Sequence, residues 1–355
     1  MSRISERSGA GVRLASLLTV TLAAGACEFP LATKDYRVEP RAEPGGVLPP
    51  TVALLRAFAG DDRDCAEAVE SSCGATLARC EAEAGCVDYS ACVREMSNPL
   101  ATTKCQDRLG TSLAAQWAYE DLLRCWYGLD AKCSVGRDFR CAGNYDLPHS
   151  ERTEFTLSER ITYLYGEGLA PDFSMAVCRL GTDCAEPSAV AALDSAGRYT
   201  VTVPWGEGLG GPGSAWTGYR LVTGPNIYPS RLESNLPVWG TRITVTRVLT
   251  KDLLDLLALS YEARQEAIFV QVVDCQSSPA PGIEVSLTDP SHGIVVYEGD
   301  GPVTVNEGAV VIRDAKLDTV LELVARRGQA GDVVASHRIT LSEGHLAYVR
   351  IYPEP

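Results

Sequence analysis

The sequence predicts a multidomain, mainly β protein, in which a disulfide-rich α-helical module precedes two antiparallel β-sandwiches. The chain has 355 residues, enough for two or three domains of ordinary size. Nine of its 13 cysteines fall between residues 65 and 141, a density typical of exported, disulfide-stabilised modules. After about residue 150, short runs of alternating apolar and polar residues replace the helix-forming composition.

Residues 1–26 have the features of an export signal. Three arginines precede an apolar stretch, residues 14–24, which is about half the roughly 20 residues that a membrane-spanning helix needs. Small residues then lead to Cys27. This arrangement resembles a bacterial lipobox, in which the cysteine becomes the lipidated N-terminus, although it also fits ordinary signal peptidase. We expect lipid attachment at Cys27, with cleavage without lipidation as the alternative.

Residues 27–59 are expected to form a tether that ends in a short helix. Five prolines lie between residues 30 and 50, and proline-rich composition extends the chain and resists packing. The alternative is an ordinary frayed N-terminus.

Residues 60–145 are expected to form a cysteine-rich helical module. The residues between the cysteines favour helix, and Asp61, Asp62 and Asp64 suit a helix N-terminus. Another helix is expected over residues 112–127. Because the gaps between cysteines are five residues or more and no histidine is suitably spaced, we expect disulfides instead of a zinc site, and no metal or cofactor.

The spacing of these cysteines suggests a nested connectivity, as in the rungs of an antiparallel helical hairpin. A step of six residues on one helix turns through about 600°, which fits a single helix face poorly, so the pairing is a hypothesis. The nested pairs are Cys80–Cys86, Cys73–Cys92 and, less well matched, Cys65–Cys105.

The remaining cysteines leave a choice. Cys178 and Cys184 are close in sequence and are expected to pair. Twelve cysteines remain besides Cys27, so one long-range bridge could join the helical module to Cys275. Alternatively, Cys275 is a buried free thiol, and one other cysteine is free as well.

Residues 153–248 and 266–355 are each expected to form an antiparallel β-sandwich. Both contain short alternating strands, such as RYTVTVP at residues 198–204, separated by Gly and Pro turns. Sheets with one solvated face give this pattern, and many short strands per module favour a sandwich. Residues 249–265 have helical composition and predict a connecting helix on a sandwich edge.

Two stretches resemble carboxypeptidase-regulatory-like domains. ALDSAGRYTVTVP at residues 192–204 matches their turn motif at Asp194, Gly197, Tyr199 and Pro204, and DCQSSPAPGIEVSL at residues 274–287 is similar to the opening of such a domain. The module order also resembles tandem β-modules of exported Gram-negative lipoproteins. The resemblance implies transthyretin-like sandwiches with a scaffold or binding role and no catalytic residue.

Residues that could carry chemistry are scattered. His149, His292, His337 and His345 show no metal-binding or catalytic spacing, and no nucleophile elbow appears. We therefore expect no enzymatic activity. The net charge of −14 argues against a nucleic-acid partner, because phosphate backbones are bound by basic faces.

The best candidate for a contact site is a glycine-rich loop flanked by aromatic residues. Trp205, Trp216, Tyr219 and Tyr228 surround it, and such rings stack on sugars or anchor partner proteins. The alternative is that these rings fill a sandwich core, which is their commonest role.

Together these features predict a non-catalytic cell-envelope lipoprotein that acts as a structural or binding scaffold. We expect it at the outer membrane or cell surface of a Gram-negative bacterium, held by its lipid anchor; a periplasmic or secreted protein is the alternative. An envelope protein or a polysaccharide is the expected partner. A second hypothesis is a subunit of an envelope assembly that binds through a strand edge or the aromatic loop. A third is a secreted hydrolase with an unrecognised site.

Overall fold

The computed structural model describes residues 49–129, 132–133, 137–146, 154–163, 173–179, 184–204, 218–236, 242–252, 267–297, 301–305, 308–328, 331–341 and 344–355. All of them belong to one compact unit, Leu48–Pro355. The expected signal, the lipidation site Cys27 and most of the expected tether lie outside the described residues.

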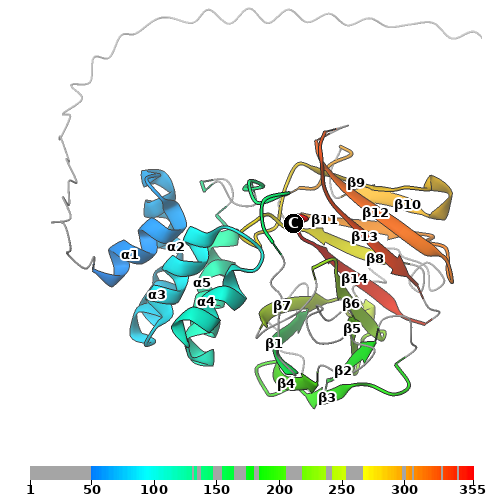
Figure 1. Ribbon diagram of the computed structural model, residues 1–355, viewed down its shortest axis with the longest axis horizontal. Coiled ribbons are helices and arrows are strands. Elements are labelled where there is room, and N and C mark those ends of the chain that lie inside the picture. The colour runs from blue at the N-terminus through cyan, green and yellow to red at the C-terminus, as the bar shows by residue number, and fades with distance from the viewer. Residues whose placement is uncertain are drawn as a thin grey trace, which may run out of the picture. The chain divides into compact units, whose positions relative to one another are not determined.

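The N-terminal part of the described chain is helical (Figure 1). Asp62 begins the second helix by accepting the amide of Cys65 at 3.0 Å, and Ser112 begins the fifth by accepting the amide of Ala115 at 3.1 Å, which satisfies backbone donors that a helix start leaves open. The helices are α1 (Pro50–Ala59), α2 (Arg63–Ala82), α3 (Cys86–Met96), α4 (Ala101–Leu109) and α5 (Leu113–Tyr127).

A core of apolar side chains and disulfides holds these helices together. Leu54 and Phe58 of α1, Tyr89 of α3 and Leu122 of α5 are buried in it. The bridges in this region are Cys65–Cys133, Cys73–Cys125, Cys80–Cys86 and Cys92–Cys105. They link α2 to α3 and α5, and α3 to α4. Covalent bonds between several helices therefore stabilise the small core.

Two of the expected pairings are wrong. Cys73 is bonded to Cys125, not to Cys92, and the Cys65–Cys105 pairing is replaced by Cys65–Cys133 and Cys92–Cys105. The hairpin interpretation considered only neighbouring helices. In the structure α5 packs along α2 and supplies the partner of Cys73, while Cys92, on a different side of α3 from Cys86, faces α4. The Cys80–Cys86 bridge is formed.

The rest of the described chain consists of strands in three sheets. The first β region contains β1 (Glu154–Tyr163), β2 (Ser174–Arg179), β3 (Ala189–Ala192), β4 (Arg198–Pro204), β5 (Gly218–Thr223), β6 (Ser230–Ser234) and β7 (Arg242–Val248). The second contains β8 (Ile268–Val272), β9 (Ile283–Leu287), β10 (Ile294–Tyr297), β11 (Ala309–Arg313), β12 (Val320–Arg327), β13 (Val333–Thr340) and β14 (Leu346–Ile351), with the short 3-10 helix η1 (Pro290–His292).

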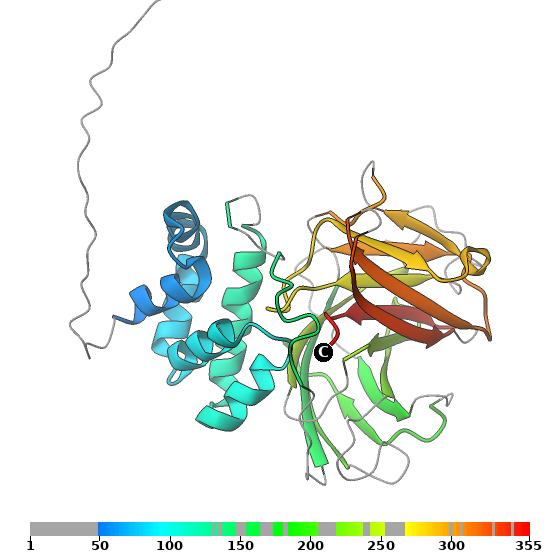
Figure 2. The same cartoon turned by 45° about the horizontal axis from the view of Figure 1, so that its top comes forward.

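One sheet runs through both β regions. Its strand order is β10-β11-β8-β14-β6-β5-β2-β3, and the two smaller sheets are β4-β1-β7 and β13-β12-β9. Strand β14 lies in its middle, parallel to both neighbours, with Tyr348 opposite Leu232 of β6 and Phe269 of β8. Figure 2 shows this C-terminal strand, in red, between the strands of the two regions.

This arrangement differs from the expected pair of antiparallel sandwiches. The two β regions share a sheet, and three of the strand pairs in the described residues, β1–β7, β14–β6 and β14–β8, are parallel. Alternation of apolar and polar residues shows which face of a strand is buried, but it does not show which strand lies beside it or in which direction.

The two β cores lie on opposite faces of the shared sheet. Leu232 belongs to the core beneath β4-β1-β7 and Tyr348 packs against it, whereas Val349 belongs to the core beneath β13-β12-β9. Successive residues of a strand point to opposite faces, so β14 contributes to both cores. Of the expected connecting helix, only residues 249–252 are described, and Lys251 and Asp252 are helical.

Candidate functional site at the junction of helices and strands

A buried carboxylate organises the turn after β8. Asp274 is 1% exposed, and its Oδ1 accepts the backbone amides of Gln276 and Ser278, both at 2.9 Å. Its Oδ2 accepts the amide of Asp138 at 3.1 Å, so the same side chain also fixes the segment that arrives from the helices. Burial raises the pKa of Asp274 to about 6, although these amide hydrogen bonds oppose the rise.

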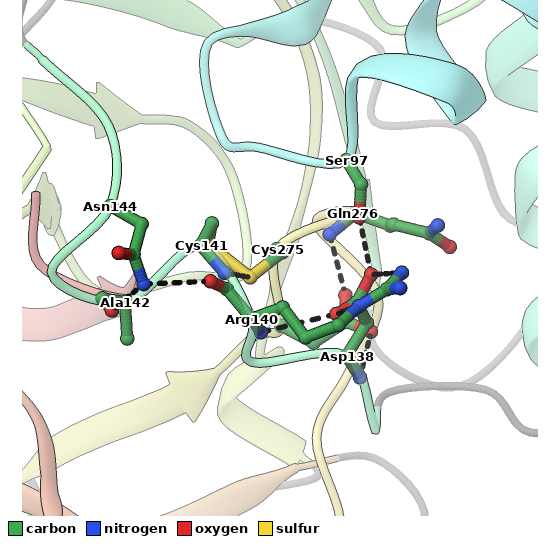
Figure 3. Close-up of polar contacts among 9 residues, drawn as sticks. Ser97, Asp138, Arg140, Cys141, Ala142, Asn144, Cys275 and Gln276 are labelled. Atoms are coloured by element: carbon green, nitrogen blue, oxygen red, sulfur yellow. Dashed lines mark hydrogen bonds and ion pairs between the residues drawn. A yellow bond between two sulfur atoms is a disulfide. The ribbon is translucent and has the colours of Figure 1, made fainter.

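A disulfide holds the same two segments together. Cys141 is bonded to Cys275, with Cα atoms 5.8 Å apart and 134 residues between them in sequence. The Cys275 amide donates to the carbonyl oxygen of Asp138 at 2.7 Å, and the Cys141 amide points to Sγ of Cys275 at 3.0 Å. Figure 3 shows the bridge beside the polar contacts of Asp138. The expected alternative of a free Cys275 is therefore wrong.

Asp138 forms the outer part of this junction. Its carboxylate accepts Nε of Arg140 at 2.9 Å and Nη2 of the same side chain at 3.0 Å, and it accepts the hydroxyl of Ser97, which follows α3 (Figure 3). Partial burial opposes ionisation, but the hydrogen bonds from Arg140 and Ser97 outweigh it and lower the pKa of Asp138 to about 2.

Helix α5 contacts the β regions through polar groups. The Tyr127 hydroxyl donates to the carbonyl oxygen of Ser277 at 2.7 Å. Asp121 forms ion pairs with Arg79 of α2 and with Arg160 of β1, each at 2.8 Å. The guanidinium of Arg198 lies 4.9 Å from the ring centroid of Trp117. Helix carboxylates and rings thus face guanidinium groups of the strands, a charge arrangement that fixes orientation.

Two further charged groups are buried inside the β regions. Glu233 of β6 is 2% exposed, and its carboxylate contacts Nε of Arg231 and, at 3.2 Å, Nε2 of His337 on β13. Glu159 of β1 pairs with Arg220 of β5 at 3.2 Å and accepts the Tyr199 hydroxyl. In both groups the charges neutralise one another, as buried charges must.

The described contacts of these clusters are ion pairs and hydrogen bonds. The Glu233 carboxylate contacts Arg231 and His337, and Nη1 of Arg231 also donates to the carbonyl oxygen of Thr340 at 3.1 Å. Among the described residues, no three His, Cys, Asp or Glu side chains are grouped to hold a metal ion. Within the same residues, no helix is both long and apolar enough to span a membrane.

Of the four aromatic residues expected to form a contact site, the structure describes Tyr219 and Tyr228. Trp205 and Trp216, like Cys27, lie outside the described residues. Tyr219 is 3% exposed, and its ring lies 4.1 Å from the Arg231 guanidinium, so its face is not open to a sugar. Tyr228 is half-buried, with the Lys251 ammonium 5.1 Å from its ring centroid. The Cys178–Cys184 bridge is formed.

Sequence reasoning raised a bridge to Cys275 but missed the charged residues of the junction and of the buried clusters. Asp138, Arg231 and Glu233 carry no local motif. Asp274 entered the sequence analysis only as part of a resemblance. An aspartate followed by a short polar turn nevertheless predicts hydrogen bonds from nearby backbone amides to its carboxylate. The partners of the other residues lie far away in sequence, so no local spacing reveals them.

Comparison with known proteins does not place the chain in a family. No family model and no curated protein matches it. Among solved structures, the Bacillus anthracis TIE protein aligns with 57% of this chain at 10% identity and a TM-score of 0.20, and the match spans only 35% of that protein.

Two pilins give similar values. The minor pilin GBS52 of Streptococcus agalactiae aligns at 10% identity and a TM-score of 0.18, over 56% of this chain and 95% of its own. The shaft pilin SpaA of Lactobacillus rhamnosus GG aligns at 12% identity and a TM-score of 0.18, over 57% and 98%. At TM-scores this low, the matches assign neither a family nor an activity.

Proposed function

We propose that the chain is a non-catalytic cell-envelope lipoprotein that serves as a structural or binding scaffold. The observation that carries the proposal is the junction. The Cys141–Cys275 bridge joins the helices to the strands, and a single sheet joins the two β regions. One disulfide and one shared sheet thus hold three parts of the chain together, which suits a protein that must hold its shape outside the cell.

The cysteine arithmetic supports export and a lipid anchor. The chain has 13 cysteines, and six disulfides use twelve of them. Disulfides persist in oxidising compartments. The thirteenth is Cys27, which follows the signal-like segment and is the cysteine that lipidation requires. A multiply acylated N-terminus holds a protein firmly at a membrane.

We further propose that each β region is a sandwich of the transthyretin-like type and that the two sandwiches share the eight-stranded sheet. The support is the division of the buried side chains into two cores, one beneath each three-stranded sheet. The outer membrane of a Gram-negative bacterium remains the proposed location.

Membrane fractionation and intact mass of the natively produced protein test the lipoprotein proposal. The expected product begins at Cys27, carries acyl chains, stays in the membrane fraction and gains twelve alkyl groups after reduction and alkylation, because six bridges open. A soluble, unacylated product cut before Cys27 would contradict it.

A second candidate function is assembly with a partner through a strand edge. β10 and β3 are the outer strands of the shared sheet, and they expose Ile294 and Val190, at 54% and 61%. Two of the other edge strands are capped by side chains. The Tyr297 hydroxyl contacts both backbone groups of Val285 on β9, and the Glu354 carboxylate accepts the Ser336 amide on β13. Capped edges resist strand addition.

Copurification from the native envelope tests this candidate. Ile294→Lys on the outer strand β10 is expected to abolish partner recovery, since a charge on an edge strand blocks pairing. Val320→Lys is the matched control, because Val320 is similarly exposed, at 60%, but lies on β12, the central strand of its sheet. Equal recovery with both variants would rule out the β10 edge. Polysaccharide binding by Trp205, Trp216 and Tyr228 stays a prediction.

A further inference from the structure

Helix α5 has two unlike faces. Its apolar face is buried in the core of the helical region through Ala115, Ala118, Leu122 and Trp126. Other side chains of the same helix follow one another at intervals of three or four residues, a spacing that places them on a common second face. We call this face the α5 stripe, and it consists of Trp117, Glu120, Asp121, Arg124 and Tyr127.

The α5 stripe meets the strands through charged groups. Asp121 pairs with Arg160 of β1 at 2.8 Å, and the Arg198 guanidinium of β4 lies 4.9 Å from the ring centroid of Trp117. Trp117 is 6% exposed, although it is not among the described side chains of the helical core, so its burial depends on the contact with the strands. Polar interfaces between parts of one chain permit those parts to move relative to each other.

The apolar attachments of this part of the chain to the strands lie outside the five helices. Among the described residues, α1 to α5 contribute no side chain to either β core. Leu100, which precedes α4, does contribute, as do Phe139, Cys141 and Tyr145 of the segment that follows α5. The chain therefore stays attached at these points, and by the bridge from Cys141 to Cys275, when the α5 stripe separates from the strands.

Glu120 lies in the middle of the α5 stripe. Burial raises its pKa to about 7, although Arg350 of β14, Arg124 of α5 and Arg160 of β1 oppose the rise. Because ionisation is opposed while α5 contacts the strands, that contact is strongest when the carboxyl is protonated. The charged and titratable groups that act on Glu120 or respond to it are Arg350, Arg124, Asp121, Arg160, Tyr127, Tyr119 and Tyr89.

We propose that the α5 stripe is a reversible docking surface, released from the strands when Glu120 loses its proton. While Glu120 is neutral, α5 is docked, that is, in contact with β1 and β4. When Glu120 gives its proton to the solvent, the new carboxylate is better hydrated away from the interface, so α5 moves away from the strands. This inference goes beyond the scaffold role proposed above, because it gives the helical region an attachment that responds to pH.

Hydroxyl-radical footprinting of the full chain, measured by mass spectrometry, tests the proposal. Helix α5 supplies a matched pair of tryptophans, since Trp117 belongs to the α5 stripe and Trp126, 3% exposed, to the helical core. We expect the ratio of Trp117 oxidation to Trp126 oxidation to rise between pH 6 and pH 8. A pKa of about 7 when docked and 4.5 when released raises the equilibrium constant for release about tenfold over that range.

Three variants separate the contributions. Glu120→Gln keeps the size of the side chain and removes its ionisation, so it is expected to lose most of the rise with pH. Glu70→Gln makes the same change at an exposed position of α2, and it is expected to keep the wild-type response. Asp121→Asn removes the ion pair with Arg160, and it is expected to raise the ratio already at pH 6.

A wild-type ratio that stays constant between pH 6 and pH 8 would overturn the proposal, as would a full pH response in Glu120→Gln. An unchanged ratio in Asp121→Asn would show that the α5 stripe does not hold the helix to the strands. A parallel rise in the oxidation of Trp117 and Trp126 would also overturn it, because the helical region would then be unfolding instead of moving away from the strands.

Discussion

Cys141 and Cys275 are 134 residues apart in sequence and covalently bonded. Their bridge lies beside Asp274, whose carboxylate accepts the amide of Asp138 at 3.1 Å. The covalent bond and the buried carboxylate therefore act on the same two segments, and they explain how a helical region and two β regions form one compact unit.

Removing the long-range bridge is expected to cost more stability than removing a short-range one. In the chain-entropy account a bridge closing more than a hundred residues contributes about 4–5 kcal/mol, and one closing only six contributes about 2 kcal/mol. Urea unfolding of Cys141→Ser/Cys275→Ser should show the larger loss. Cys178→Ser/Cys184→Ser, with a separation of 6 residues, is the matched control. Equal losses from both double variants would contradict the role of the junction.

Asp274 is expected to make the protein less stable as pH rises. Its folded pKa of about 6 is above the ordinary value of 3.8, so its contribution is fully present below about pH 4 and is lost as pH rises through 6. Asp274→Asn should remove this slope, on the order of 2–3 kcal/mol between pH 4 and 7. Unfolding free energies at four pH values measure it. A wild-type slope that the variant retains would show that another group is responsible.

Asp138 is expected to make the protein less stable as pH falls, the opposite of the effect of Asp274. Its folded pKa of about 2 is below the ordinary value of 3.8, so the stability that it contributes is present above about pH 4 and is lost as pH falls towards 2. In acid denaturation followed by circular dichroism, Asp138→Asn should have lower stability near neutrality and a flatter response below pH 4. The idea fails if wild type and variant lose stability in parallel over that range.

Glu233 is expected to be far more important for stability than a partly exposed glutamate. Glu233→Gln leaves Arg231 buried without its carboxylate, which typically costs 3–5 kcal/mol. Glu322→Gln breaks the Arg338 pair, whose side chains are 73% and 34% exposed, and such pairs contribute about 0–1 kcal/mol. Chemical denaturation of the two variants compares them directly. A loss at Glu233 no larger than at Glu322 would mean that Arg231 finds another partner.

The elements themselves could be predicted from sequence because their signals are local. The helix over residues 112–127 is α5 (Leu113–Tyr127), begun by Ser112, and the RYTVTVP run is β4 (Arg198–Pro204). Both follow from periodicity and capping, which involve residues a few positions apart.

The long-range relationships could not be predicted in the same way. Cys73 pairs with Cys125 because α5 packs along α2, and β14 joins the two β regions because it lies between β6 and β8. Neither fact changes any local pattern. The even number of cysteines besides Cys27 suggested a long-range bridge to Cys275. Which of the nine cysteines between residues 65 and 141 is its partner depends on the packing, so it could not be predicted.

The central claim, that a long-range disulfide joins the helical region to the strands, is tested most directly by mapping disulfides in a proteolytic digest of the unreduced protein. The account predicts a peptide pair joining Cys141 to Cys275, together with Cys73–Cys125 and Cys65–Cys133. A digest in which Cys275 is alkylated as a free thiol, with Cys141 joined to a cysteine of the helices, would contradict it.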